Sequence, residues 1–302
     1  MELIGKTNID FIGMKKISFI ISGIIAIVGL IGMIQMARGA ANMGIDFSGG
    51  TAVQLKFTQP VGMDKAREAL GKHGLKDATL QDIKEGNKLL VKVGKTTLAT
   101  GKVADTIEDV FKKEFVGNQF IVESSTEIGP SVGDKLRKDT LTAIVISMFG
   151  IILYIAWRFD FKFGVGATIA TMHDVLAMFA VFYIMNKEVN LLFVTAVLTI
   201  AGYSLTDTVV VFDRIRENLH KNLKEAMHNV FNKSINEVLS RTIVTSLTAF
   251  LAAVALLFFG GEVIHDFAFA LVIGIAVGTY SSIFVASPIV SLWEERGIQV
   301  KS

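Results

Sequence analysis

The sequence predicts an α-helical polytopic membrane protein with six transmembrane helices and one small α+β domain between the first and second of them. Two observations lead to this fold class. Hydrophobic residues make up 51% of the 302 residues, the mean hydropathy is +0.53, and the apolar residues gather in long blocks. Between the first two blocks, roughly a hundred residues return to the mixed composition of a soluble domain with its own core.

The first predicted membrane helix runs from Ile17 to Met36 and follows a short polar segment that contains Lys6, Lys15 and Lys16. A span of this length crosses a bilayer core of about 30 Å. The apolar run is longer than the core of a signal peptide and lacks a convincing A-x-A cleavage site, so we expect it to be retained. Residues 1–37 therefore form the N-terminus and the first transmembrane helix.

The block from residue 38 to 138 has the alternation of strands and helices of a small domain. Val53, Leu55 and Phe57 alternate with polar or small residues, which is typical of a half-buried strand. The further predicted elements are helix 63–73, strands 78–84 and 88–93 around a turn at 85–87, helix 106–115 and strand 120–128. This order is typical of the ferredoxin-like fold, in which four antiparallel strands carry two helices on one face.

A short motif, D-F-S-G-G from Asp46 to Gly50, precedes the first strand. We interpret it as a tight turn in which Gly49 and Gly50 adopt dihedral angles that other residues resist. The motif does not favour a phosphate-binding loop, because no helix follows the glycines directly. The motif is therefore a structural feature of the domain.

Five further membrane helices are predicted in residues 139–292, followed by a short tail at 293–302. Their approximate ranges are 140–157, 163–185, 191–212, 243–259 and 267–292. The last of them carries small residues every four positions, which allows close helix packing. These are Ala270, Gly274, Gly278, Ser282 and Ala286.

The distribution of basic residues predicts the orientation. Lysines and arginines gather near the N-terminus, after the second helix and in the polar link 213–241, whereas the short loops on the opposite side contain only Lys187. By the positive-inside rule, both termini and the link lie in the cytosol. The domain 38–138 is then extracytoplasmic. Within the link, apolar and charged residues interleave as in an amphipathic helix on the membrane surface.

Asp207 is the foremost candidate functional residue, because it interrupts the apolar segment of the fourth predicted helix. A carboxyl group at membrane depth costs roughly 2.5–3.5 kcal/mol on insertion scales, so it should face the protein interior or a wet cavity. Tyr203 and Ser204 lie one turn before it. An interhelical hydrogen bond would explain Asp207, but we favour a site that carries protons.

Arg241 opens the fifth predicted helix. An arginine at such a helix end is commonly a topology anchor that extends to the lipid headgroups. If the fourth and fifth helices are antiparallel neighbours, however, Arg241 and Asp207 lie toward the same side of the membrane and a contact between them is reasonable. Changing their separation could then switch the proton occupancy of the carboxyl group, because a nearby cation favours the anion.

Two further aspartates are weaker candidates. Asp213 lies about 120° around the helix from Asp207 and belongs to a charge cluster that solvation explains. Asp174 follows His173 inside the third helix, where a hydration path and a structural bond to a neighbouring helix are equally good explanations.

Other classes of site are excluded. The chain has no cysteine, which removes disulfides, thiolate catalysis and cysteine metal sites. Its five histidines show no metal-ligand spacing. A formal net charge of only +2 gives no support for a nucleic-acid partner.

The motifs identify a resemblance to a known family. The stretches M-G-I-D-F-S-G-G, G-Y-S-L-T-D-T-V-V-V-F-D-R-I-R-E-N and S-R-T-I-V-T-S, with six spans and one large outer loop, resemble the SecF family of bacterial protein-export membrane proteins over essentially the whole length. Thr206 departs from the family pattern, which commonly places asparagine there. The resemblance implies that the family's proton-pathway aspartate falls on Asp207 and its arginine partner on Arg241.

The resemblance also implies the biological context. SecF is half of a unit related to the resistance, nodulation and division transporters, and SecD is the other half. It implies a non-enzymatic subunit of the bacterial inner membrane that, with SecD, uses proton flow to promote translocation of unfolded polypeptide through the SecYEG channel. The coupling ion is the proton, and no cofactor is expected. A drug or lipid exporter of the same superfamily and a passive scaffold are the competing interpretations.

Overall fold

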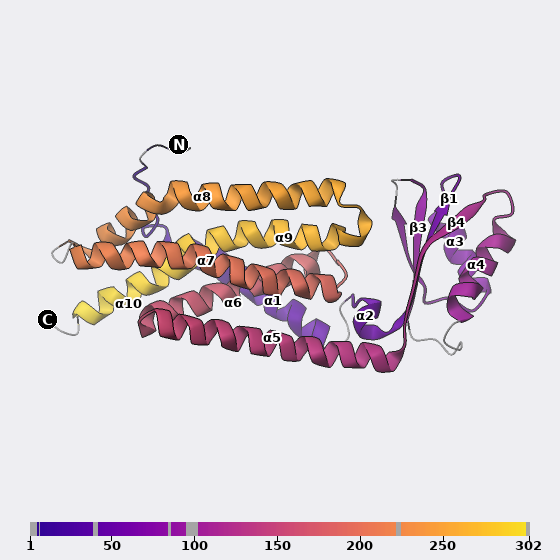
Figure 1. Cartoon of the computed structure of the whole chain (residues 1–302), viewed down its shortest axis with the longest axis horizontal. Helices are drawn as coiled ribbons and strands as arrows, with labels where there is room; N and C mark the ends of the chain where they lie inside the picture. Colours follow the sequence, from indigo (N-terminus) through magenta and orange to yellow (C-terminus); the bar gives the residue numbers. More distant parts are fainter. Residues whose placement is uncertain are drawn as a thin grey trace. The chain divides into compact units, whose positions relative to one another are not determined.

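The computed structural model describes residues 5, 7–38, 42–83, 86–94, 102–221 and 225–299. Figure 1 labels most of its helices and strands. The chain divides into two compact units. A membrane unit comprises Met1–Asn42 and Ala143–Ser302, and a smaller unit comprises Met43–Thr142. These boundaries lie a few residues from the predicted limits at 38 and 138.

The smaller unit is a four-stranded antiparallel sheet with two helices. Its elements are α2 (Ile45–Ser48), β1 (Gly50–Phe57), α3 (Met63–Lys72), β2 (Thr79–Ile83), β3 (Lys88–Val93), α4 (Lys102–Glu114) and β4 (Phe120–Ile128). The strand order is β2-β3-β1-β4, and every pairing is antiparallel. This arrangement confirms the ferredoxin-like fold. Lys84 and Glu85, which belong to the predicted hairpin, lie outside the described residues.

The period of two in β1 produces the core of this unit. Val53 and Leu55 are fully buried on the face that α3 and α4 cover, as are Ile107 and Phe111 of α4. Because successive strand residues point to opposite faces, the intervening polar residues remain on the open face. Burial of each large apolar side chain contributes about 1.5–3 kcal/mol.

The glycine pair before β1 has the conformational freedom that the sequence predicts. Gly49 and Gly50 have φ angles of 69° and 139°, which L side chains rarely adopt. A Cβ atom on Gly50 would also collide with the carbonyl oxygen of Val93 on β3. Asp46 lies in the first turn of the short helix α2, directly before these glycines.

The membrane unit contains helices long and apolar enough to cross a bilayer six times within the described residues, which confirms the predicted number. Five spans are α1 (Lys15–Ala37), α5 (Pro130–Arg158), α6 (Phe161–Ile184), α7 (Leu191–Lys221) and α8 (Met227–Phe259). The last span is α9 (Glu262–Ser281), the single-turn π-helix η1 (Ser282–Ala286) and α10 (Ser287–Gln299). The protein is a multi-pass membrane protein.

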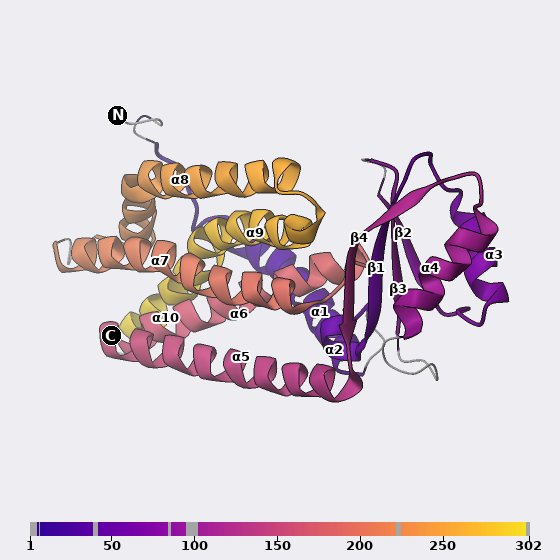
Figure 2. The ribbon, with the colours of Figure 1, turned by 45° about the vertical axis from the view of Figure 1, so that its right-hand side comes forward.

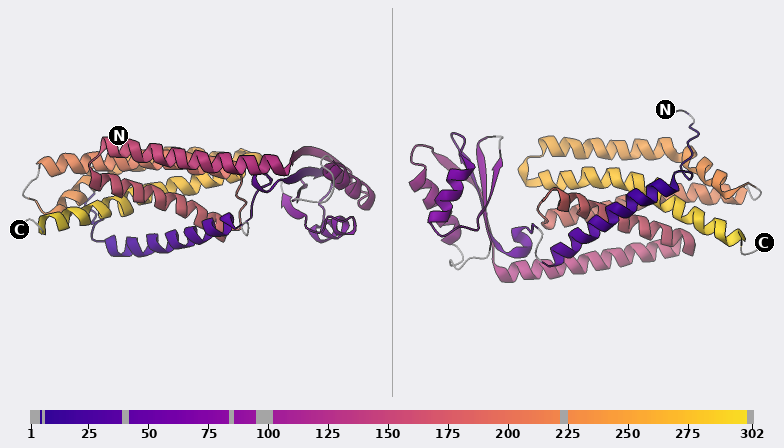
Figure 3. Two further views of the ribbon diagram at one scale, coloured as in Figure 1. Left: turned by 90° about the horizontal axis from the view of Figure 1, so that it is seen from below. Right: turned by 180° about the vertical axis from the view of Figure 1, so that it is seen from behind.

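Helices α6, α7 and α9 are the most buried spans, and they form the centre of the membrane unit. Helix α1 packs along α6, as Figure 3 shows, and α8 packs against α7 and α9. A Cβ atom at Gly274 or Gly278 of α9 would collide with Ile200 or Ser204 of α7. The small-residue stripe of the last span therefore brings these helices close together, as predicted.

The link 213–241 differs from the prediction. We expected a separate amphipathic helix on the membrane surface, but α7 continues to Lys221 and α8 already begins at Met227. Val230, Phe231 and Ile235 are fully buried, and Phe231 and Ile235 belong to the core of the membrane unit. The apolar face of this first part of α8 therefore packs against other helices of the protein. Residues 222–224 lie outside the described part of the chain.

Candidate functional site

Asp207 lies at the meeting point of three helices. Its side chain is 5% exposed on α7, and its Oδ2 atom accepts a hydrogen bond of 3.0 Å from Ser246 Oγ on α8. Ser246 in turn accepts a hydrogen bond of 2.7 Å from Thr279 Oγ1 on α9. The structure thus confirms that α7 and α8 are neighbours at Asp207. A change in the charge of this carboxyl group would act on the contacts among all three helices.

Asp174 forms a second buried carboxyl site on α6, with no exposed surface. It accepts hydrogen bonds from Ser204 Oγ on α7 at 2.5 Å and from Ser281 Oγ on α9 at 2.8 Å. The Nδ1 atom of His173 lies 3.2 Å from its other oxygen. The sequence left two explanations for Asp174, a hydration path and a structural bond to a neighbouring helix. The structure contains such bonds, to α7 and to α9.

The two carboxyl sites share a polar layer between α7 and α9. Ser204 precedes Asp207 by three residues, so both lie on one face of α7. On the same face, Thr208 Oγ1 lies 2.9 Å from Ser282 Oγ, the first residue of η1. Single π-turns within α-helices frequently occur at functional sites. Hydroxyl groups of α7 and α9 bond to Asp174, whereas the hydroxyl that bonds to Asp207 comes from α8.

His173 has an unsatisfied atom. Among the described residues, its Nε2 atom and Thr242 Oγ1 are the buried side-chain polar atoms without a hydrogen-bond partner. The His173 and Tyr280 ring centroids are 6.1 Å apart, and the Tyr280 hydroxyl lies 3.1 Å from Ser22 Oγ on α1. A buried polar atom without a partner costs about 1–3 kcal/mol, so His173 is a further polar candidate in this layer.

Arg241 does not contact Asp207 in this structure. Its side chain is exposed, and no ion pair joins the two residues, both of which are described. The reason is helical phase, because five residues between Arg241 and Ser246 turn α8 by about 140°. Ser246 faces α7, whereas Arg241 points away from it. The predicted contact between Asp207 and Arg241 is therefore not formed here.

The remaining predicted residues surround the site. The Tyr203 hydroxyl donates to the Thr245 carbonyl oxygen on α8 at 3.4 Å. Thr206 is exposed, and its hydroxyl donates to the Gly202 carbonyl oxygen at 3.3 Å. Asp213 accepts two hydrogen bonds, of 3.0 and 2.8 Å, from the Arg158 guanidinium group on α5. Asp213 thus connects α5 to α7, away from the buried layer.

Sequence reasoning named Ser204, which bonds to Asp174, but missed the other hydroxyl partners of the two acids. Ser246, Thr279 and Ser281 were not predicted as site residues, although T-Y-S-S from Thr279 to Ser282 is a polar run inside an apolar span. That run indicates polar contacts between helices, because hydroxyl groups at membrane depth commonly form hydrogen bonds across helices. No cluster of three or more His, Asp or Glu side chains suited to a metal ion occurs in the part of the chain that the structure describes.

Family models decide the classification. The model of the C-terminal region of SecD/SecF protein-export membrane proteins matches residues 106–296, and the SecD/SecF GG motif matches residues 41–61. The chain belongs to the SecD/SecF family. The second match contains Asp46, Gly49 and Gly50, so the turn before β1 is a feature of this family.

Individual relatives agree with this family. A protein translocase subunit SecF of Thermodesulfovibrio yellowstonii is 54% identical over 294 residues, which cover 97% of each chain. Another, from Calditerrivibrio nitroreducens, is 43% identical and covers 97% of this chain and 96% of the relative. The crystal structure of Thermus thermophilus SecDF, a translocon-associated membrane protein, matches with a TM-score of 0.86 and 35% identity.

A second crystal structure of SecDF, in a super-membrane-facing form, matches with a TM-score of 0.71 and 35% identity. The chain spans 40% of the length of either solved SecDF chain. Its fold thus corresponds to part of SecDF.

Proposed function

We propose that this chain is the SecF-type subunit of a bacterial protein-export system. With a SecD-type partner it would use the proton motive force to promote translocation of unfolded polypeptide through the SecYEG channel. The family match and the relative that is 54% identical, itself named as a translocase subunit SecF, support this role. In this proposal protons are the coupling ion, and we assign no enzymatic reaction and no cofactor to the chain.

The observation that carries proton coupling is the buried hydrogen bond between Asp207 and Ser246. An unpaired anion at this depth is costly, so an ionised Asp207 would require a cation close by. A rotation or shift of α8 that carries Arg241 toward α7 would supply such a cation. Deprotonation would then favour one arrangement of α7 and α8, and protonation would favour the other, which makes a two-state element.

The available energy is sufficient for such a cycle. One charge that crosses 100 mV releases about 2.3 kcal/mol, and each unit of pH difference adds about 1.36 kcal/mol. Typical coupling free energies between sites in proteins are about 1–3 kcal/mol. A single proton can therefore shift the equilibrium between two arrangements of the helices.

The positive-inside distribution supports the orientation that belongs to this proposal. Both termini and the ends of α7 and α8 near residues 213–241 lie in the cytosol, and the smaller unit lies on the outer face of the inner membrane. There it is suitably placed to act on polypeptide that leaves the channel. Tyr203, Ser204, Thr206, Asp174 and Asp213 are secondary candidates for the proton pathway.

The test uses proteoliposomes that contain the channel, the SecD-type partner and this chain. Asp207→Asn should abolish proton flux and proton-driven stimulation of export, while membrane insertion and partner binding remain. Asp160→Asn is the matched control, because Asp160 is an exposed residue before α6. Normal stimulation by a stable Asp207→Asn variant would exclude Asp207 as the coupling residue.

The same vesicles separate the competing functions. A passive scaffold would support export equally with and without a proton gradient, and it would conduct no protons. An exporter half of the same superfamily would move drug-like or lipid molecules in response to the gradient. Proton-dependent movement of unfolded polypeptide without transport of these small molecules is the result expected here.

A further inference from the structure

The segment before α1 is bound to the start of α8. We name residues Asn8 to Gly13 the N-terminal strap. Asn236 on α8 contacts both backbone groups of Ile9, since its Oδ1 accepts from Ile9 N at 3.0 Å and its Nδ2 donates to Ile9 O at 2.9 Å. One turn earlier, Asn232 Oδ1 accepts from Ile12 N at 3.0 Å. These asparagines bind the strap through its backbone, as a neighbouring strand would.

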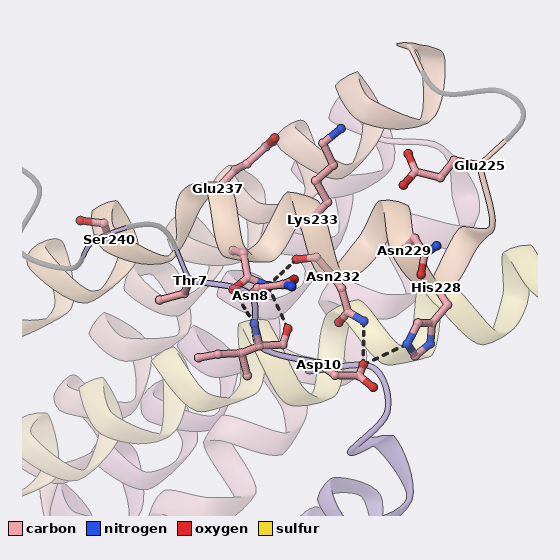
Figure 4. A pocket seen from close by; sticks show the side chains of 13 residues that line it. Thr7, Asn8, Asp10, Glu225, His228, Asn229, Asn232, Lys233, Glu237 and Ser240 are labelled. Carbon is pink, nitrogen blue, oxygen red and sulfur yellow. Dashed lines mark hydrogen bonds and ion pairs between the residues drawn. The ribbon is translucent and has the colours of Figure 1, made fainter.

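Asp10 adds a charged contact to the same helix. Figure 4 shows its carboxyl group between Asn232, whose Nδ2 donates at 2.6 Å, and His228, whose Nε2 lies 3.0 Å away. The backbone N–H of Gly13 also donates to this carboxyl group at 2.8 Å. The Gly13 N–H and then Asn232 hold the pKa of Asp10 below its ordinary value, so the carboxylate stays charged.

Apolar side chains fix the strap in place. Phe11 is 5% exposed and Ile12 is fully buried, and both belong to the core that includes Phe231 and Ile235 of α8. The Phe11 ring also meets Phe284 of η1 edge to face, with centroids 5.6 Å apart. Withdrawal of the strap would expose these apolar side chains to water, which is unfavourable. The strap and the start of α8 therefore share one apolar core.

The strap continues directly into α1. The N–H groups of Met14 and Lys15 donate to the carbonyl oxygens of Phe11 and Ile12, so a turn joins the strap to the helix. At its other end, α1 leads along the chain into the smaller unit, which starts at Met43. The strap thus contacts α8 and continues into α1, and the chain runs from α1 into the smaller unit.

Helix α8 extends from the strap to the proton site. Asn236 and Ser246 are ten residues apart, or about 15 Å along a helix. Although α8 bends near its start, as Figure 2 shows, its helix is continuous from Met227 to Phe259. A displacement of α8 at Asp207 would therefore reach the strap through a hydrogen-bonded helix.

We propose that the N-terminal strap couples α8 to α1, with Asp10, Asn232 and Asn236 as its positioning residues. The inference rests on the proposed proton-driven function. It adds a path by which a movement of α8 is transmitted to α1. A shift of α8 against α7 pulls the strap, and the strap moves the start of α1. The smaller unit follows α1 along the chain, so the start of α1 is the end point of the movement that we assign to the strap.

The absence of cysteine from the chain permits a reversible test. The double variant Asp10→Cys with Asn232→Cys removes the charged contact, and a short bis-methanethiosulfonate reagent then reconnects the same two positions. Proton flux and export stimulation are measured in proteoliposomes before and after cross-linking. We expect the reduced form to keep its proton flux while export stimulation falls about fivefold or more, which corresponds to a coupling of at least about 1 kcal/mol. Cross-linking should restore the stimulation.

A milder variant covers the case in which the double variant fails to fold. Asn236→Leu removes both hydrogen bonds to Ile9 but keeps the size of the side chain, and it should lower stimulation at unchanged proton flux. Asn229→Leu is the matched control. Asn229 lies on the same helix beside the strap, and no side-chain hydrogen bond from it to the described strap residues is present.

Three results would overturn the coupling. These are normal stimulation by the reduced and Asn236→Leu variants, lost stimulation that cross-linking does not restore, and loss of proton flux together with stimulation. Failure of the proposed function is distinguishable, because it would appear in the wild-type chain as export that does not respond to a proton gradient.

Discussion

Ser246 on α8 donates a hydrogen bond from its hydroxyl group to the Asp207 carboxyl group on α7, across 39 positions of sequence and a distance of 3.0 Å. Both side chains are buried, at 6% and 5% exposure. The bond joins the two helices at the point where the sequence places an acid within an apolar segment. Removing this bond therefore tests directly how much the buried acid contributes to the stability of the fold.

Ser246→Ala should destabilise the membrane unit by roughly 1 kcal/mol, because interhelical hydrogen bonds in membranes contribute about 0.6 kcal/mol on average and up to about 1.7 kcal/mol. The midpoint of thermal unfolding in detergent measures the effect. Ser246→Thr keeps a hydroxyl donor and should remain close to wild type. Equal midpoints for the alanine variant and the wild type would show that the bond contributes no stability.

Asp174→Ala should be more damaging than any change at Asp213. It removes the carboxyl partner of Ser204, Ser281 and His173 Nδ1, and although Ser281 Oγ keeps the Gly278 carbonyl oxygen as an acceptor, the cost should be about 1–3 kcal/mol. Asp213→Ala breaks only a half-exposed ion pair with Arg158, which is worth about 1 kcal/mol or less. The yield of monodisperse protein and its unfolding midpoint provide the comparison. The reverse order of damage would contradict the assignment of Asp174 as an interhelical junction.

Gly29→Ala should loosen the packing of α1 on α6, because the added Cβ would collide with the carbonyl oxygen of Leu176. Overpacking of this kind typically costs about 1–3 kcal/mol. Gly23→Ala is the matched control on the same helix, since nothing lies within 4 Å of its Cβ position. Alanine is a better helix former than glycine, so the control should be neutral or slightly stabilising. The midpoints of thermal unfolding of both variants are compared with that of the wild type. Equal midpoints for Gly29→Ala and Gly23→Ala would contradict the prediction.

The smaller unit should lose stability in acid through Glu123 on β4. Lys88 Nζ lies 2.8 Å from its carboxylate, and Gln54 donates to it at 2.9 Å. The hydrogen bond from Lys88 lowers the pKa of Glu123 below its ordinary value of 4.5. A group with a lowered folded pKa stabilises the fold above its unfolded pKa, and this contribution is lost as pH falls through the folded pKa.

Hydrogen exchange of the β1 and β4 amides between neutral pH and pH 3 would measure this loss in the intact chain. Because the partners are partly exposed, the contribution should be about 1 kcal/mol or less. Glu123→Gln removes the titrating group and should flatten this part of the pH dependence. An unchanged dependence in that variant would assign the acid sensitivity to other carboxylates.

The elements of the smaller unit follow from local patterns. The two-residue period of Val53, Leu55 and Phe57 fixes both the strand and its buried face, and Gly49 and Gly50 mark the turn before it. One detail was not local. Between Gln54 and Leu55 the register with β4 shifts, so Glu123 is an extra residue opposite β1. Such a bulge depends on how two distant strands fit, and the sequence pattern does not specify it.

By itself, the sequence determined the six spans, the ferredoxin-like order of the smaller unit and the position of Asp207 within an apolar helix. Span length, hydrophobic period and turn residues are local properties, and each is readable within a window of about 20 residues. The buried acid was visible for the same reason, because a carboxyl group stands out in an apolar run.

Only the tertiary structure decided which groups meet. It placed Ser281 of α9 on Asp174, 107 positions away, gave Asp207 a serine partner and turned Arg241 to the outside. It also bound the N-terminal strap to α8, more than 220 positions later. Such contacts depend on the rotation and crossing of helices as whole bodies, which side-chain packing sets over the entire unit. A rotation of one helix by a single residue step, about 100°, changes every partner while the local pattern stays the same.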